Sequence, residues 1–231
     1  MNLILFDIDG TLLNTHGAGK LAFEEAISRV CNRNIDLSNV DWLGRVDGEI
    51  INETLLRAGF SDIEIRSLVP VIFEEYVSRL RVLSEKNRNG FEIMPGVKTL
   101  LSVLNEHPIG LITGNILSAA FVKLGAVGLD SCFPYGVGGF GDDCNIRSEL
   151  VKIAIDRASG HYDSDFKRAV VIGDSARDIE AVRSCPECGC DIISVAVATG
   201  GMDIQTLSKY NPDFLFPDLS DLNKVVNIIT S

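Results

Sequence analysis

Short, mainly apolar runs recur along the chain, and helical patterns lie between most of them. The runs are residues 3–6, 109–112, 169–172 and 192–198, with a weaker one at 214–216. A strand that is buried on both faces has this continuous apolar character, which is typical of a parallel sheet. The helical patterns are residues 97–105, 116–124, 148–158 and 176–184. Because strands alternate with helices, we predict an α/β fold with a Rossmann-like three-layer αβα core and a parallel sheet.

Residues 15–92 have a different pattern, because this stretch contains no convincing strand. Its apolar residues follow a helical spacing over residues 18–30, 48–58 and 61–83. We predict an inserted all-helical cap domain at residues 15–92 and a core domain formed by residues 1–14 and 93–231. Hinges between the two are expected near residues 14–15 and 91–95.

The net charge of the chain is −11. This acidity argues against a nucleic-acid partner and against an anionic membrane surface, since both attract a basic face. It does not argue against a small phosphorylated substrate, because one local cation and a metal ion can reverse the potential within a site. No apolar run approaches the roughly 18 residues of a membrane-spanning helix. With no signal-like segment at the N-terminus, we expect a cytoplasmic protein, and nothing in the sequence implies an obligate protein partner.

Polar residues directly follow three of the apolar runs. They offer carboxylates, a hydroxyl and backbone N–H groups, and they are Asp7, Asp9, Thr113, Gly114, Asn115, Asp174 and Asp178. In an open parallel sheet the carboxyl ends of the strands meet at one edge, where ligands bind. We therefore predict that these residues share one site.

Three of these segments resemble signature motifs of the haloacid dehalogenase superfamily of hydrolases. They are DIDGTL at residues 7–12, ITGN at residues 112–115 and GDSARD at residues 173–178, similar to the first, second and fourth motifs. The helical insert after the first motif looks like the small helical (C1-type) cap of the family, so the match covers essentially the whole chain. The resemblance implies a phosphoglycolate-phosphatase-like enzyme with Mg²⁺ as its cofactor.

The two aspartates of the first motif suit a two-step displacement at phosphorus. Asp7 is the candidate nucleophile, because a carboxylate can form a covalent aspartyl-phosphate. Asp9 is the candidate general acid and base, which protonates the leaving alcohol and then activates water. Mg²⁺ prefers oxygen ligands, and Asp7, the Asp9 backbone carbonyl and Asp174 can supply three. Asp178 is expected to support the metal through water or through another ligand.

The second motif offers groups that suit a phosphate. The Thr113 hydroxyl can donate a hydrogen bond, and the amides of Gly114 and Asn115 open a predicted helix. The family usually adds a lysine as its third motif, and this sequence departs from that pattern. Arg147 is the only basic residue between Gly141 and Leu150, and its planar fork can bind phosphate. We favour Arg147 on position, and Lys152 is the alternative.

A loop of the predicted cap carries the candidate for substrate recognition. Residues 43–47 resemble the Gly-Arg-Thr-Asp loop of phosphoglycolate-phosphatase-like relatives, with Val46 in place of threonine. Arg45 can meet a carboxylate or a second anion of the substrate. The alternative is an exposed arginine that pairs with Asp47 or Glu49.

The predicted site indicates a Mg²⁺-dependent phosphatase that acts on a small phosphate monoester. Dehalogenases of the family need no metal and lack the aspartate equivalent to Asp9. A sugar-phosphate mutase shares Asp7, Asp9 and the small cap, and differs mainly in keeping water from the aspartyl-phosphate. A catalytically silent binding or regulatory module is the alternative from another class, although such a module needs no nucleophile beside a metal.

Three of the six cysteines form a C-x-x-C-x-C cluster: Cys185, Cys188 and Cys190. A structural zinc site usually has four ligands in two pairs, and no second pair follows. Three reduced thiols are therefore favoured over a metal or redox site.

Overall fold

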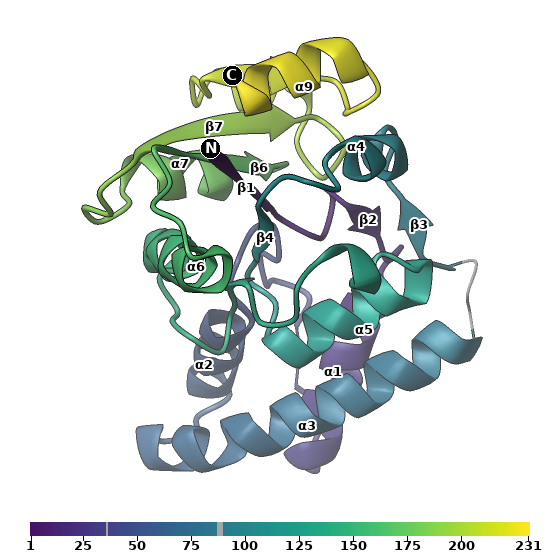
Figure 1. Ribbon diagram of the computed structural model, residues 1–231. Coiled ribbons are helices and arrows are strands. Elements are labelled where there is room, and N and C mark those ends of the chain that lie inside the picture. Colours follow the sequence, from purple (N-terminus) through teal and green to yellow (C-terminus); the bar gives the residue numbers. More distant parts are fainter. Residues whose placement is uncertain (36, 87–89) are drawn as a thin grey trace.

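A six-stranded parallel sheet forms the centre of the molecule (Figure 1). The computed structural model describes residues 1–35, 37–86 and 90–231. The strands lie in the order β5-β4-β1-β6-β7-β8, and each neighbouring pair is parallel. Their bounds are β1 (Asn2–Phe6), β4 (Ile109–Ile112), β5 (Gly138–Gly139), β6 (Arg168–Gly173), β7 (Asp191–Val197) and β8 (Phe214–Phe216). The predicted α/β fold with a parallel sheet is confirmed.

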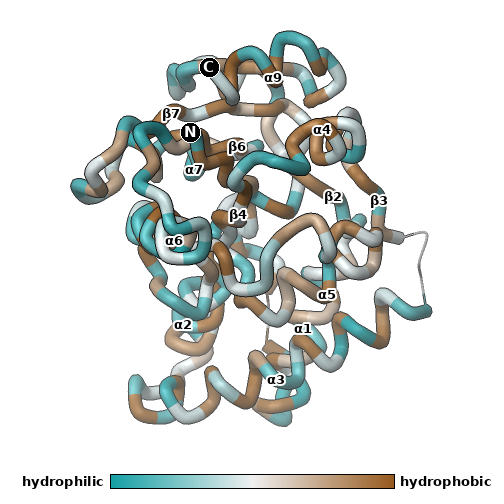
Figure 2. Tube along the Cα trace, in the orientation of Figure 1, coloured by the Kyte–Doolittle hydropathy of each residue, from teal (hydrophilic) through white to brown (hydrophobic). Residues whose placement is uncertain are grey.

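Helices lie on both sides of this sheet and give the core its three layers (Figure 1). They are α4 (Val97–Val103), α5 (Leu117–Val127), η2 (Asp130–Cys132), α6 (Arg147–Tyr162), α7 (Ala176–Arg183), α8 (Ile204–Ser208) and α9 (Leu222–Thr230). In β1, Ile4 and Phe6 pack with α4 and α9, whereas Leu3 and Leu5 pack with α6. Successive strand residues point to opposite faces, so this one apolar run contributes to both halves of the core. Figure 2 shows the hydrophobic residues concentrated in the central strands.

The insert is helical, as predicted, and packs on the core through α5. It consists of α1 (Ala18–Val30), α2 (Asp47–Arg57) and α3 (Asp62–Lys86). The insert has a hydrophobic cluster of its own that includes Phe23, Ile51 and Leu80, and α5 adds Ala119 to this cluster. The helix α5 therefore packs against the sheet on one side and against the insert on the other. Within the described residues, no helix is long and apolar enough to cross a membrane.

A short antiparallel ribbon lies where the chain leaves and re-enters the core. It pairs β2 (Leu13–Asn14) with β3 (Glu92–Ile93). The sequence predicted hinges at these two places but no strand. A strand of two residues is too short to show the alternation of apolar and polar residues that identifies a strand. The cap boundaries at residues 15 and 92 stay a prediction. The edge strand β5 was also missed, since it consists of two glycines, which rarely favour strands.

Candidate active site

The carboxyl ends of three adjacent strands form one edge of a cavity. β1 lies between β4 and β6, so Asp7, Thr113 and Asp174 come from neighbouring strand ends. The cavity has a volume of about 470 Å³ and also includes residues of the helical insert, among them Trp42 and Tyr76. The order of the strands therefore brings together the motifs that the sequence placed at strand ends.

Three buried carboxylates lie at this edge. Asp7, Asp174 and Asp178 each offer one oxygen, and these oxygens lie within 4.8 Å of one another. The pKa of Asp7 is raised to about 7, chiefly by burial; Arg147 opposes this rise, and the charges of Asp178 and Asp9 add to it. Burial likewise raises the pKa of Asp174, and the charges of Asp7 and Asp178 add to the effect. A cation between these groups would offset the cost of burying like charges together.

Asp174 presents an oxygen that suits a hard metal ion. Its Oδ1 accepts a hydrogen bond from Thr11 at 3.3 Å, whereas its Oδ2 is buried without any partner. A Cβ atom on Gly200 would overlap this Oδ2, so glycine is needed beside it. Buried polar atoms without a partner are costly, and Mg²⁺ takes oxygen ligands. The donor set therefore fits a divalent cation.

Asp178 is held by protein groups on both of its oxygens. Its Oδ2 accepts from the Ser175 backbone N–H at 3.0 Å, which is the contribution of Asp178 to the capping box of α7. The same oxygen also accepts from the Ser175 hydroxyl at 2.6 Å. Its Oδ1 accepts from Arg147 Nη2 at 2.5 Å and Nε at 3.0 Å. Both oxygens of Asp178 therefore accept hydrogen bonds from protein groups.

Arg147 reaches the cluster from the first turn of α6. Its Nη2 lies 3.0 Å from Asp7 Oδ1, and its Nη1 donates to the Gly44 carbonyl at 3.1 Å. The side chain is 8% exposed. Lys152 is further along the same helix, where it is exposed and pairs with Asp156 at 3.0 Å. Of the two candidate cations, Arg147 is the one that the fold brings to the carboxylates.

The second motif forms a small hydrogen-bond network around Thr113. Thr113 Oγ1 accepts from the Asn115 backbone N–H at 3.2 Å and from Asn115 Nδ2 at 2.8 Å. Since this oxygen accepts twice, its own hydrogen is left to donate. Gly114 has a structural part as well, because its carbonyl accepts from Asp47 N at 2.8 Å and a Cβ on it would overlap the Arg45 carbonyl oxygen.

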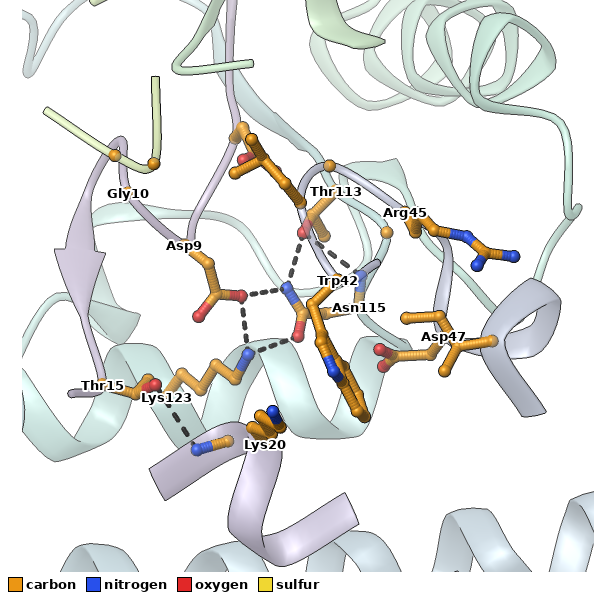
Figure 3. A pocket seen from close by; sticks show the side chains of 18 of the residues that line it. Asp9, Gly10, Thr15, Lys20, Trp42, Arg45, Asp47, Thr113, Asn115 and Lys123 are labelled. Carbon is orange, nitrogen blue, oxygen red and sulfur yellow. Dashed lines mark hydrogen bonds and ion pairs between the residues drawn. The ribbon is translucent and has the colours of Figure 1, made fainter. Parts of the chain in front are cut away.

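Lys123, a lysine that was not predicted from the sequence, lies at the side of this network (Figure 3). Its ammonium group lies 2.6 Å from Asp9 Oδ2 and 2.6 Å from Asn115 Oδ1. Asn115 Nδ2 also donates to Asp9 Oδ2, at 2.7 Å. The available signal was that Lys123 is the only charged residue in α5, LSAAFVKLGAV, whose other residues are mostly apolar.

The insert contributes aromatic rings and charged groups to the cavity. The Phe23 ring packs edge-on against Trp42 at 5.4 Å and against Tyr76 at 5.0 Å. Lys20 lies over the Trp42 ring at 5.5 Å. Arg45 extends away from Asp9 (Figure 3) and pairs with Glu49 at 2.8 Å and Glu53 at 2.6 Å. The alternative from the sequence was an exposed arginine that pairs with Asp47 or Glu49. Arg45 does pair with Glu49, but its side chain is only 7% exposed.

A family model of haloacid dehalogenase-like hydrolases matches residues 1–185. The chain belongs to this family. Curated relatives of this hydrolase include proteins named pyrophosphatase PpaX. One from Bacillus pumilus is 23% identical over 98% of this chain and 96% of its own length, and one from Listeria welshimeri is 24% identical over 96% and 95%.

Solved structures of similar fold extend over nearly all of this haloacid dehalogenase-like hydrolase. A predicted phosphatase from Clostridium acetobutylicum has a TM-score of 0.68 at 17% identity and covers 98% of both chains. A predicted phosphoglycolate phosphatase from Haemophilus somnus has a TM-score of 0.65 at 20% identity and covers 97% of both chains. A β-phosphoglucomutase from Clostridium difficile has a TM-score of 0.67 at 19% identity, with 99% and 96% coverage. At these identities the likeness shows the fold.

The three cysteines of the C-x-x-C-x-C cluster of this hydrolase are not among the residues that line the cavity. Cys188 Sγ and Cys190 Sγ are 3.8 Å apart. Burial and the neighbouring thiols raise the pKa of Cys185 and Cys190 to about 12, so both are protonated near neutral pH. Among the described residues, the three cysteines do not form a group compact enough to share one metal ion.

Proposed function

We propose that this hydrolase is a Mg²⁺-dependent phosphatase that cleaves a small phosphate monoester through an aspartyl-phosphate on Asp7. The observation that carries the proposal is the buried group of Asp7, Asp174 and Asp178, with an unpartnered oxygen on Asp174. Asp9 and Thr113 line the same cavity. The names of the curated relatives support hydrolysis at phosphorus.

The residues proposed to hold Mg²⁺ are Asp7, Asp174 and the Asp9 backbone carbonyl, with Asp178 in support. When bound, the ion supplies positive charge that stabilises the phosphoryl oxygens during transfer. Arg147 contacts Asp7 at 3.0 Å and thereby fixes the orientation of the nucleophile. Its guanidinium is also the protein cation proposed to meet the phosphate. The Thr113 hydroxyl and the amides of Gly114 and Asn115 are proposed to bind the remaining phosphate oxygens. For this, the Asn115 backbone N–H must exchange its 3.2 Å hydrogen bond to Thr113 Oγ1 for one to the phosphate.

The chemistry divides into two displacements in which Asp9 moves the proton. In the first, Asp7 attacks phosphorus, the bond from phosphorus to the ester oxygen breaks, and Asp9 gives its proton to the departing alcohol. In the second, Asp9 takes a proton from water, whose oxygen attacks the phosphorus. The bond between phosphorus and Asp7 then breaks, which releases inorganic phosphate and restores both carboxyl groups.

The cavity volume of about 470 Å³ supports a small-molecule substrate. We propose a member of the phosphoglycolate-phosphatase-like subgroup, in which Arg45 meets a second anionic group. Such a substrate must compete with Glu49 and Glu53 for the guanidinium. A preference for phosphoglycolate over a neutral aryl phosphate supports this role of Arg45, and equal turnover of the two contradicts it.

The test is release of inorganic phosphate from phosphoglycolate, sugar phosphates, nucleotides, pyrophosphate and an aryl phosphate. With Mg²⁺, the wild-type protein should hydrolyse at least one of them, and EDTA should abolish the reaction. Asp7→Asn should reduce it to background, because an amide cannot form the acyl phosphate. The matched control is Asp156→Asn, which changes an exposed carboxylate on α6 and should leave the rate unchanged.

Metal binding can be followed apart from activity. Mg²⁺ should raise the melting temperature of the wild-type protein, since a ligand that binds the folded state stabilises it. Interconversion of sugar phosphates without phosphate release would indicate a mutase. Folded protein that binds Mg²⁺ but hydrolyses none of the esters would contradict the proposal and favour a silent binding module.

A further inference from the structure

Lys123 is a buried lysine that has no role in the proposed reaction steps. It lies in α5, and its side chain is 5% exposed. Burying a charged group is unfavourable unless it is paired and hydrogen-bonded. Both requirements are met here, because the ammonium group pairs with Asp9 and donates to the Asn115 side-chain oxygen.

The surrounding structure leaves space for this ammonium group. Gly19 lies in α1 of the insert, and a Cβ atom there would be 3.3 Å from Lys123 Nζ. A larger residue at position 19 would crowd the contact with Asp9. The Lys123 ammonium therefore occupies a place bordered by the core helix, the insert and the Asp9 carboxylate.

The two oxygens of Asp9 have different surroundings. Oδ2 accepts from Lys123 at 2.6 Å and from Asn115 Nδ2 at 2.7 Å. Among the described residues, no hydrogen bond to Oδ1 is found, and the Asp9 side chain is 41% exposed at the cavity. A carboxylate held through one oxygen has a fixed plane, so its other oxygen points in a fixed direction.

We propose that Lys123 is a positioning residue that, together with Asn115, holds Asp9 through Oδ2 and presents Oδ1 to the ester oxygen of the substrate. This inference rests on the proposed phosphatase function. In the first displacement the proton moves from Asp9 Oδ1 to the ester oxygen as the bond from phosphorus to that oxygen breaks. The electron pair of that bond stays on the departing oxygen, and Asp7 forms the new bond to phosphorus.

The role predicts a dependence on the leaving group that a merely structural lysine would not show. An alkoxide is a poor leaving group and requires the proton, whereas 4-nitrophenolate departs readily without one. We therefore compare kcat/KM for an alkyl phosphate, phenyl phosphate and 4-nitrophenyl phosphate in wild type, Lys123→Met and Lys123→Arg. The ratio kcat/KM is used because it reports the steps up to departure of the leaving group, before water attacks the aspartyl-phosphate.

Lys123→Met should lower kcat/KM for the alkyl phosphate by about 100-fold or more, the range of general acid catalysis, and for 4-nitrophenyl phosphate by less than about 3-fold. Lys123→Arg keeps the charge and should recover part of the loss. Lys98→Met, on the exposed side of α4, is the matched control and should change none of the three values. Thermal melting of each variant shows whether it is folded.

A double-mutant cycle with Asp9→Asn tests whether Lys123 acts through Asp9. On phenyl phosphate, adding Lys123→Met to Asp9→Asn should cost less than about 3-fold, because residues that act as a unit are not additive. An equal loss on all three esters, or a full additional loss in the Asp9→Asn background, would overturn the proposal. Wild-type protein that hydrolyses no ester would instead contradict the phosphatase function on which it rests.

Discussion

At the residue scale, the balance of charge at the carboxylate cluster depends on Arg147. Asp7, Asp174 and Asp178 are buried together, and Arg147 contacts Asp7 and Asp178 directly. Without it, the nucleophile loses its ion pair with the guanidinium, and the cluster loses the protein cation that contacts it. A preorganised charge in a site shielded from water is worth far more than a charge in water.

Arg147→Ala should lower kcat by about 100-fold or more, the usual effect of removing one preorganised donor. Lys152→Ala should keep near-normal turnover, since that lysine is exposed and pairs with Asp156. Steady-state kinetics on the best ester of the panel measure both. The reverse outcome, with Lys152→Ala inactive and Arg147→Ala active, would show that Lys152 is the phosphate cation.

The sequence predicted the residues at strand ends better than it predicted those that reach the site from helices. Asp7, Thr113 and Asp174 share one cavity because strand ends in a parallel sheet meet at one edge. Lys123 reaches the site from the middle of α5. Which side of that helix faces the cavity depends on how the helix packs, and the sequence alone does not show this. The pairing of Arg45 with Glu53 depends on how the loop before α2 folds against that helix, and the link from Arg147 to Gly44 needs the insert folded onto the core. Neither contact has a sequence signal.

At the scale of elements, the long periodic segments were predictable and the very short ones were not. The principal strands and the helices of the insert have apolar patterns that match their burial. The ribbon of β2 and β3 depends on a pairing between residues about 80 positions apart, for which two residues per strand give no local pattern. The amphipathic helix α9 was missed, although Val225 and Ile229 are fully buried.

One element contact makes a prediction about pH. The helix α5 begins beside Asp47 of the insert, whose Oδ2 accepts from the Ile116 backbone N–H at 3.1 Å. Burial raises the pKa of Asp47 from 3.8 to about 7, against the lowering effect of Lys123 and with smaller raising effects of Asp9 and Asp142. The folded state therefore binds the Asp47 proton more tightly than the unfolded state does.

Since the folded pKa is raised, the contribution of Asp47 to stability is greatest below pH 4 and falls as the pH rises toward 7. Asp47→Asn keeps an oxygen acceptor for Ile116 and removes this dependence. Compared with wild type, the variant should gain up to about 4 kcal/mol in the free energy of unfolding between pH 4 and pH 8. Denaturant unfolding at several pH values measures the gain. A difference between the two proteins that does not change with pH would show that Asp47 is ionised throughout.

At the scale of the whole molecule, the cavity lies between the core and the insert, so a movement of the insert would change the access of substrate to the carboxylates. Trp42 and Tyr76 of the insert line the same cavity as Asp7 and Asp174 of the core. Several contacts hold the loop of the insert on the core. The Gly44 carbonyl accepts from Arg147, Asp47 N donates to the Gly114 carbonyl, and Asp41 lies 3.5 Å from Arg177.

A disulfide across this contact tests whether the insert must open. A Cβ atom on Gly44 would lie 3.1 Å from Arg177 Cβ, below the spacing of about 3.5–4.5 Å found in disulfides, and would overlap Ser175 Oγ at a positive φ. The loop must therefore shift slightly to accept the bridge, which is why the oxidised protein is compared with its own reduced form. Oxidised Gly44→Cys/Arg177→Cys should lose ester hydrolysis, and reduction should restore the rate of the reduced double variant, because opening of such caps gates entry. The single variants, which keep the six native cysteines, control for other oxidation and should respond little to the oxidant. A cross-linked protein that turns over as fast as its reduced form would mean that substrate reaches Asp7 without movement of the insert.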